Sequence, residues 1–205
     1  MPFLVSDENL PAILTAEPMT DEEFVAFCAQ HPDLNFEMTA EGELIVMAPT
    51  YSETGARNSV VGARLLDWAI QDGRGIVCDS SAGFVLPNGA RRSPDASWTI
   101  ASRVEELGEG KRKKFWHLCP DFIIEVKSAS DRLKALQKKM REYLDQGAQL
   151  GWLINPEEKW IEIYRPGQTI ERLASVEKLA GEGPVAGFVM DLTYVWNPYA
   201  YLRRP

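Results

Sequence analysis

The run Pro120–Ser128 constrains this 205-residue chain most, because it places charged residues inside an apolar segment. The apolar residues follow a proline and include branched and aromatic side chains, which predicts a buried strand from Phe122 to Lys127. Glu125 and Lys127 are two positions apart, so their side chains leave the same face of that strand. Charged groups in such a strand are costly unless they are paired or bind a metal ion. The run therefore predicts a polar site on a core strand.

A second acid, Asp95, follows a proline thirty positions before Glu125 and would complete such a site. Mg²⁺ binds one or two carboxylates together with substrate oxygens and water. We therefore expect Asp95 and Glu125 to bind Mg²⁺, with Mn²⁺ as an alternative ion and the backbone carbonyl of Val126 as a third ligand. Lys127 would hold or deprotonate a metal-bound water, whose pKa the metal lowers. In the alternative, Asp95 ends a turn while Glu125 and Lys127 pair with other side chains, and spacing alone does not decide between them.

Strands and helices interleave along the chain. Thr20 and Glu23 form a capping box, which predicts a helix that ends near His31. The interleaved order predicts an α/β fold with a mixed central sheet flanked by helices, in a single domain over residues 1–205. Residues before Met19 and the basic stretch 108–114 are expected to be irregular. The other expected elements are helices over 54–71 and 131–146, helical turns over 102–107, and strands over 34–39, 44–47, 76–79, 83–86, 95–100, 152–154 and 160–164.

The charge distribution differs from the total. A net charge of −8 argues against a nucleic-acid partner. Residues 91–141, however, hold 13 Lys and Arg against 7 Asp and Glu, whereas the rest of the chain holds 9 against 23. A basic field around two carboxylates suits a polyanion such as DNA; the alternative is that these residues only solvate helix faces. The residues expected to bind phosphate are Arg91, Arg92, Lys111, Arg112, Lys113 and Lys114.

The three cysteines, Cys28, Cys78 and Cys119, are odd in number and widely spaced. We expect reduced thiols in a cytoplasmic protein. Cys28 and His31 with His117 and Cys119 could in principle bind zinc, but their spacing departs from the usual tetrahedral patterns.

Membrane and secretory segments are not expected. No apolar run reaches the roughly 20 residues that span a bilayer. The first ten residues include two acids and no basic segment, so they do not form a secretory signal.

Pro94–Asp95 followed by Glu125–Lys127 resembles the signature of the PD-(D/E)XK nuclease superfamily, a proline-aspartate pair and then acid-any-lysine. More narrowly, the chain resembles the Uma2 family of restriction endonucleases. Six ordered segments, which together are fairly specific, carry that resemblance: Asn35–Glu37, Glu41–Thr50, Pro94–Trp98, Pro120–Ser128, Lys139–Tyr143 and Trp152–Pro156.

The resemblance implies a restriction-endonuclease-like core and Mg²⁺-dependent hydrolysis of DNA phosphodiester bonds, with a homodimer as the expected assembly. It makes Asp95 and Glu125 metal ligands and Lys127 the catalytic lysine. Glu37 corresponds to the acid of the family's N-terminal segment, although a surface or hairpin-paired acid fits it as well. Lys139 and Tyr143, four positions apart on a helix, share a face and would orient Glu125 or a phosphate. Tyr143 is equally consistent with a core aromatic residue.

Two other classes of function stay open at this point. A nuclease-like fold can be kept as a catalytically silent binding or regulatory module, and the acidic total favours that reading. The charged strand residues can also form ion pairs in a purely structural partner protein. Mg²⁺ binding would distinguish the silent module from the structural protein. Turnover of a nucleic-acid substrate would distinguish an enzyme from both.

Overall fold

The computed structural model describes residues 12–15, 19–47 and 50–202. A six-stranded sheet forms its centre, in the order β11-β10-β9-β8-β7-β4. Neighbouring strands are antiparallel except β8 and β9, which are parallel and are connected by helix α5 (Leu133–Asp145). This confirms the predicted strand-helix-strand unit. The strands are β4 (Gly75–Asp79), β7 (Ala96–Ile100), β8 (Phe122–Val126), β9 (Leu150–Asn155), β10 (Trp160–Tyr164) and β11 (Glu171–Ala174).

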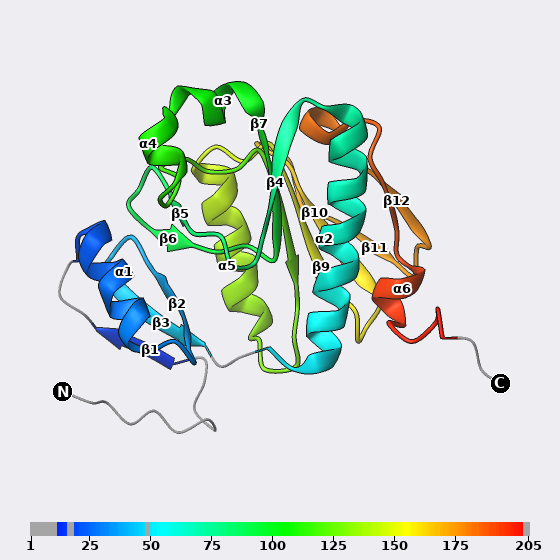
Figure 1. The fold of residues 1–205 in the computed structure, drawn as a ribbon. Coiled ribbons are helices and arrows are strands. Elements are labelled where there is room, and N and C mark those ends of the chain that lie inside the picture. Colours follow the sequence, from blue (N-terminus) through cyan, green and yellow to red (C-terminus); the bar gives the residue numbers. More distant parts are fainter. Residues whose placement is uncertain (1–11, 16–18, 48–49, 203–205) are drawn as a thin grey trace.

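Helix α2 (Ser52–Asp72) and helix α5 cover opposite faces of this sheet (Figure 1). In β8, alternate residues serve the two cores: Phe122, Ile124 and Val126 pack with the α2 side, whereas Ile123 packs with the α5 side. Side chains alternate along a strand, so Glu125 leaves the face that α5 covers. Burial on both faces explains why β8 reads as a continuous apolar run.

A second sheet holds the N-terminal part of the chain, in the order β1-β3-β2-β6-β5. Helix α1 (Asp21–Gln30) packs against it and begins with the predicted capping box. Strand β6 pairs with β2 through Arg91 and Met38, and the chain then passes into β7. The second sheet is therefore joined to the first just before Asp95. Its strands are β1 (Ala12–Thr15), β2 (Asn35–Met38), β3 (Glu43–Met47), β5 (Phe84–Val85) and β6 (Arg91–Arg92).

Several expectations need correction. Ala12–Thr15, expected to be irregular, pairs with β3 as β1; residues 1–11 and 16–18 lie outside the described residues. The basic stretch 108–114 contains a short helix, α4 (Glu109–Arg112). Helix α5 begins two residues late, because the Asp131 carboxylate accepts hydrogen bonds from the N–H and hydroxyl of Ser128 and holds the preceding residues in a loop.

The C-terminal elements complete the α2 side of the core. The C-terminal hairpin and the segments around it bury residues such as Phe188 and Val195 in that core. Within the part of the chain that the structure covers, no helix is long and apolar enough to cross a membrane. The remaining elements are α3 (Ala101–Glu106), β12 (Lys178–Ala180), η2 (Gly183–Val185), β13 (Val189–Asp191) and α6 (Thr193–Trp196).

Gly181 tests the packing of that hairpin. A Cβ atom at Gly181 would lie 2.4 Å from the backbone oxygen of Val185 and 3.1 Å from Cβ of Phe188. We expect Gly181→Ala to lower the free energy of unfolding by about 1–3 kcal/mol, because backbone must move to relieve the contact. The control is Gly110→Ala in α4, where a Cβ would meet nothing within 4 Å. Urea denaturation of the two variants measures the difference, and equal stability would contradict this packing.

Candidate active site

A cleft of about 700 Å³ lies where the two sheets meet. Side chains from both sheets and from α5 line it, among them Arg92, Asp95, Glu125 and Lys139. Asp95 and Glu125, thirty residues apart in sequence, are brought together because β7 and β8 are neighbours in the central sheet. The cleft is therefore a polar site built on core strands.

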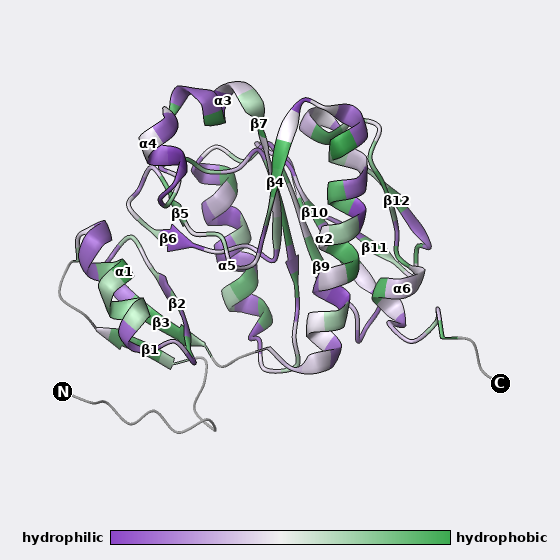
Figure 2. Cartoon of the chain, in the orientation of Figure 1, coloured by the Kyte–Doolittle hydropathy of each residue, from purple (hydrophilic) through white to green (hydrophobic). Residues whose placement is uncertain are grey.

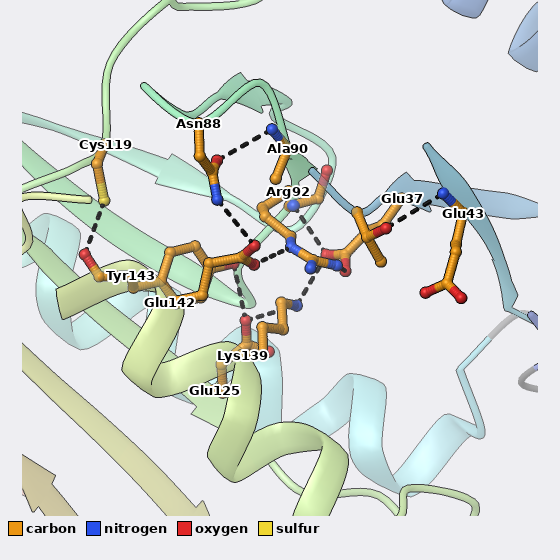
Figure 3. Close-up of polar contacts among 12 residues, drawn as sticks. Glu37, Glu43, Asn88, Ala90, Arg92, Cys119, Glu125, Lys139, Glu142 and Tyr143 are labelled. Carbon is orange, nitrogen blue, oxygen red and sulfur yellow. Dashed lines mark hydrogen bonds and ion pairs between the residues drawn. The ribbon is translucent and has the colours of Figure 1, made fainter. Parts of the chain in front are cut away.

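Lys139 of α5 connects two acids from different sheets (Figure 3). Its Nζ lies 2.7 Å from Oε1 of Glu125 on β8 and 2.8 Å from Oε1 of Glu37 on β2. Both carboxylates are buried, with 4% and 2% of their surface exposed. These three ionisable groups stabilise one another only as a set, because Lys139 or an ionised carboxylate alone would be an unpaired charge inside the protein.

Arg92 and Tyr143 support this set from either side. The Arg92 guanidinium lies 3.1 Å from Glu37 and 2.6 Å from Glu142, and the backbone N–H of Ser93 also donates to Glu37 at 2.9 Å. The Tyr143 hydroxyl donates to Oε1 of Glu125 at 3.1 Å. Tyr143 is fully buried, so it acts both as a core aromatic residue and as a hydrogen-bond donor to the site.

Asp95 is held just beyond the N-terminal end of β7. Its Oδ2 accepts the backbone N–H of Val126 at 2.7 Å, and its Oδ1 accepts the Asn58 amide at 2.7 Å. The N–H and C=O of a strand residue leave on the same side, so the Val126 carbonyl also faces the side of β8 on which Asp95 lies. The expected juxtaposition of Asp95, Glu125 and Val126 is thus present in the structure.

Asn58 was not identified from the sequence. It lies on α2, and its Oδ1 is buried without a hydrogen-bond partner among the described residues. A signal was present: Thr54, Asn58, Val61 and Leu65 recur at helical spacing, which places a polar amide in line with the buried face of α2.

Burial controls the protonation of the site. It raises the pKa of Asp95 to about 6, although the Val126 N–H and Lys139 oppose the shift. Burial, reinforced by Asp95 and Glu37, also holds the pKa of Glu125 well above its usual range despite Lys139. Burial alone would lower the pKa of Lys139, but Glu125 and Glu37 outweigh it and raise that pKa. Lys139 is therefore a cation at neutral pH. It lies between Glu125, which resists ionisation, and Glu37, whose pKa is lowered because Lys139 and Arg92 outweigh the effect of burial.

Lys127 does not lie with these groups. Strand β8 ends at Val126, so the alternation that would place Lys127 beside Glu125 stops one residue too early. The Lys127 ammonium instead donates to the backbone carbonyl of Ser128 at 2.9 Å. The ammonium group that contacts Glu125 belongs to Lys139 on the following helix.

The residues expected to bind phosphate fall into two groups. Arg91 and Arg92 are buried, and Arg91 contacts Asp21 and the Met19 carbonyl, each at 2.8 Å. The other four, Lys111, Arg112, Lys113 and Lys114, are exposed on or beside α4.

Two of the four residues considered for zinc, His117 and Cys119, have other polar partners. The His117 ring lies 2.6 Å from Asp21, and the Cys119 thiol donates to the Tyr143 carbonyl at 3.4 Å. Across residues 12–15, 19–47 and 50–202, no three His, Cys, Asp or Glu side chains are placed to hold a metal ion. A cation at Asp95 and Glu125 would therefore need backbone, substrate or water oxygens as further ligands.

Comparison with known proteins agrees with this architecture. A family model described as "Putative restriction endonuclease" matches residues 21–193. The chain belongs to this family, Uma2. No curated protein matches it. The crystal structure of a "putative nuclease belonging to DUF820" from Anabaena variabilis ATCC 29413 superposes with a TM-score of 0.72 and 22% sequence identity.

That superposition covers 87% of this chain and 98% of the other. The resemblance to the Uma2 family and the expected fold class, a mixed sheet flanked by helices with a restriction-endonuclease-like core, are confirmed. The family description supports a nuclease function.

The raised pKa of Asp95 predicts a pH dependence of stability. Between its ordinary pKa of 3.8 and about 6, the folded state binds more protons than the unfolded state, so ionisation of Asp95 costs stability as pH rises. We expect Asp95→Asn to gain stability relative to the wild type from pH 4 to pH 7, by on the order of 3 kcal/mol.

Urea unfolding at a series of pH values, without divalent cations, measures this gain. The exposed Asp33→Asn variant is the matched control and should follow the wild type. Parallel curves for Asp95→Asn and the wild type would contradict the assignment of a buried, destabilised carboxylate.

Proposed function

We propose that this protein is a Mg²⁺-dependent endonuclease that hydrolyses phosphodiester bonds in DNA and acts as a homodimer. One observation carries the proposal: Lys139, a lysine with 13% of its side chain exposed, contacts both Glu37 and Glu125 in a cleft that also contains Asp95. Ionisable groups with perturbed pKa values in a cleft are typical of sites kept for chemistry. The family description supports the same class of reaction.

The oxygen donors at the cleft suit a hard divalent cation. Asp95 and Glu125 offer carboxylates, and the Val126 carbonyl faces the side of β8 where Asp95 lies. Both side-chain contacts to Glu125 are made to Oε1, which leaves Oε2 for a cation. Two carboxylates with few further protein ligands are typical of Mg²⁺ sites that also bind substrate phosphate, and Mn²⁺ accepts the same oxygen ligands.

In the proposed reaction, Asp95, Glu125 and the Val126 carbonyl would hold Mg²⁺. When bound, Mg²⁺ would neutralise charge on the phosphate and lower the pKa of a nearby water. Lys139 carries a positive charge, so it would orient the attacking water and stabilise negative charge on the phosphate as a hydrogen-bond donor. Lys139 thereby takes the role expected of Lys127. Glu37 would hold Lys139 in position.

DNA binding is proposed for the exposed basic residues. Arg91 and Arg92 are already engaged by Asp21, Glu37 and Glu142, so they would support the site from behind. The exposed residues of 111–114 would attract the DNA backbone, and so would the exposed face of α5, the helix that carries Lys139. Such contacts give affinity without choosing a sequence. The basic residues on that face of α5 are Lys134, Lys138 and Arg141.

A catalytically silent nuclease-fold module is the second candidate. Both oxygens of Asp95 and one oxygen of Glu125 already accept hydrogen bonds from the protein, so the cluster is stable without a substrate. The net charge of −8 also limits nonspecific affinity for DNA. Turnover decides between the two candidates.

A pair of lysine variants tests the proposed roles. We expect Lys139→Met to slow Mg²⁺-dependent plasmid cleavage by about 10²–10³-fold, because it removes a positioned charge at the reacting phosphate. Lys127→Met should cleave at a rate close to the wild type, since its ammonium contacts only a backbone carbonyl. Circular dichroism verifies that both variants fold. Loss of cleavage in Lys127→Met with retention in Lys139→Met would overturn the assignment.

A further inference from the structure

Strand β4 forms an open edge of the central sheet. In the described part of the chain its sheet partner is β7 alone. The Arg74 carbonyl accepts the Ala101 N–H at 2.9 Å, and hydrogen-bonded pairs alternate along an antiparallel ladder. The N–H and C=O groups of Gly75 and Val77 and the N–H of Asp79 therefore point away from β7, whereas the Asp79 carbonyl accepts the Ala82 N–H at 3.1 Å. An unpaired row of this kind can pair with another strand.

The two edges of this sheet differ in protection. The opposite edge strand, β11, carries Glu171 and Arg172, both exposed. Strand β4 contains no lysine or proline, and its one charged residue, Asp79, is at its end. Charges and prolines are how proteins prevent edge pairing, so β4 lacks the usual protection.

An exposed apolar stripe on α2 lies beside this edge. Ala63, Leu66 and Ile70 recur at helical spacing on the exposed surface of α2, with Leu66 46% and Ile70 71% exposed. A groove of about 730 Å³ between α2 and β4 joins this part of the helix to the strand. Figure 2 shows hydrophobic residues recurring along both elements.

Two glycines of α2, Gly55 and Gly62, line the same groove, although no neighbouring atom of the described residues excludes a larger side chain there. A Cβ atom at Gly55 or at Gly62 would meet nothing within 4 Å. Glycine inside a helix is destabilising relative to alanine. No contact within the described residues requires glycine at either position. Close approach of a second chain to this groove would require it.

We propose that a second copy of this chain occupies this face. Antiparallel pairing about a two-fold axis places Val77 opposite Val77, and Gly75 opposite Asp79, so the outward groups of each strand meet those of the other. Arg74 at one end of β4 pairs with Asp72 of its own chain at 2.8 Å and would also lie near Asp79 of the other protomer, an arrangement that occurs twice. The two α2 stripes lie side by side above a continuous sheet.

This interface bears on the cleft. Thr50, Ser80 and Asp95 line both the groove beside α2 and the cleft that holds Lys139. A second copy on the groove would therefore close the side of Asp95 away from Lys139 and limit the access of water to it. That consequence rests on the catalytic part of the proposed function. The mass of the assembly tests the homodimer alone and does not depend on catalysis.

Sedimentation equilibrium of the full chain tests the interface. The wild type should have twice the chain mass of 23.0 kDa, and Leu66→Lys/Ile70→Lys should halve the measured mass. The matched control is Val25→Lys/Val189→Lys, at residues 48% and 54% exposed on other elements, which should stay dimeric. A monomeric wild type, or a stripe variant that keeps the wild-type mass, would overturn the proposal. A dimer that never cleaves DNA would contradict only the proposed function.

Cross-linking tests the strand register. In a background with Cys28 and Cys78 replaced by serine, Val77→Cys should form a covalent dimer under mild oxidation, because the two residues face each other across the axis. Asp33→Cys, in an exposed turn on another element, is the control and should stay uncross-linked. A dimer in which Val77→Cys fails to cross-link, or cross-links no better than Asp33→Cys, would overturn this register.

Discussion

The structure of the site depends on one largely buried ammonium group, that of Lys139. Lys139 reaches from α5 to Glu125 on the central sheet and to Glu37 on the N-terminal sheet, so one side chain joins three elements. Burying these three ionisable groups is costly, and the cost is offset only while all of them remain together. Arg92 extends the same arrangement to Glu142, which ties β6 back to α5. The relative position of the two sheets is therefore coupled to the geometry of the cleft.

This coupling also explains the chemistry available at the cleft. One lysine neighbours three acids, Asp95, Glu125 and Glu37, so the carboxylates exceed the positive charge closest to them. Burial then raises the pKa values of Asp95 and Glu125, while Lys139 stays charged. A divalent cation would supply the missing positive charge. Under the proposed function, a bound cation and phosphate would therefore lower the cost of ionising Asp95 and Glu125.

The sequence was sufficient to predict those strands and helices whose residue patterns are local. The apolar run of β8 predicted a buried strand carrying Glu125, and the order of strands and helices predicted the mixed sheet. Lys127 was placed beside Glu125 because the strand was expected to continue through it, and strand ends are set by tertiary pairing that periodicity does not reveal. Lys139 was recognised as a neighbour of the site, but its contact with Glu37 depends on how two sheets pack.

Asn58 shows a different limit. Its position follows the buried face of α2, yet sequence spacing cannot say which strand loop that face meets. Strand β1 was missed for a similar reason. Ala12–Thr15 is short and half exposed, so its own residues predict a strand only weakly, and it becomes a strand by pairing with β3.

The most direct test of this account is diffraction from crystals soaked in Mn²⁺, recorded for its anomalous signal. We predict a peak bounded by Asp95, Glu125 and the Val126 carbonyl, with the Lys139 ammonium beside Glu125 and the Lys127 ammonium elsewhere. Absence of a peak at saturating Mn²⁺, or a peak with Lys127 in place of Lys139, would contradict the central claim that the buried lysine of α5 belongs to a cation-binding catalytic site.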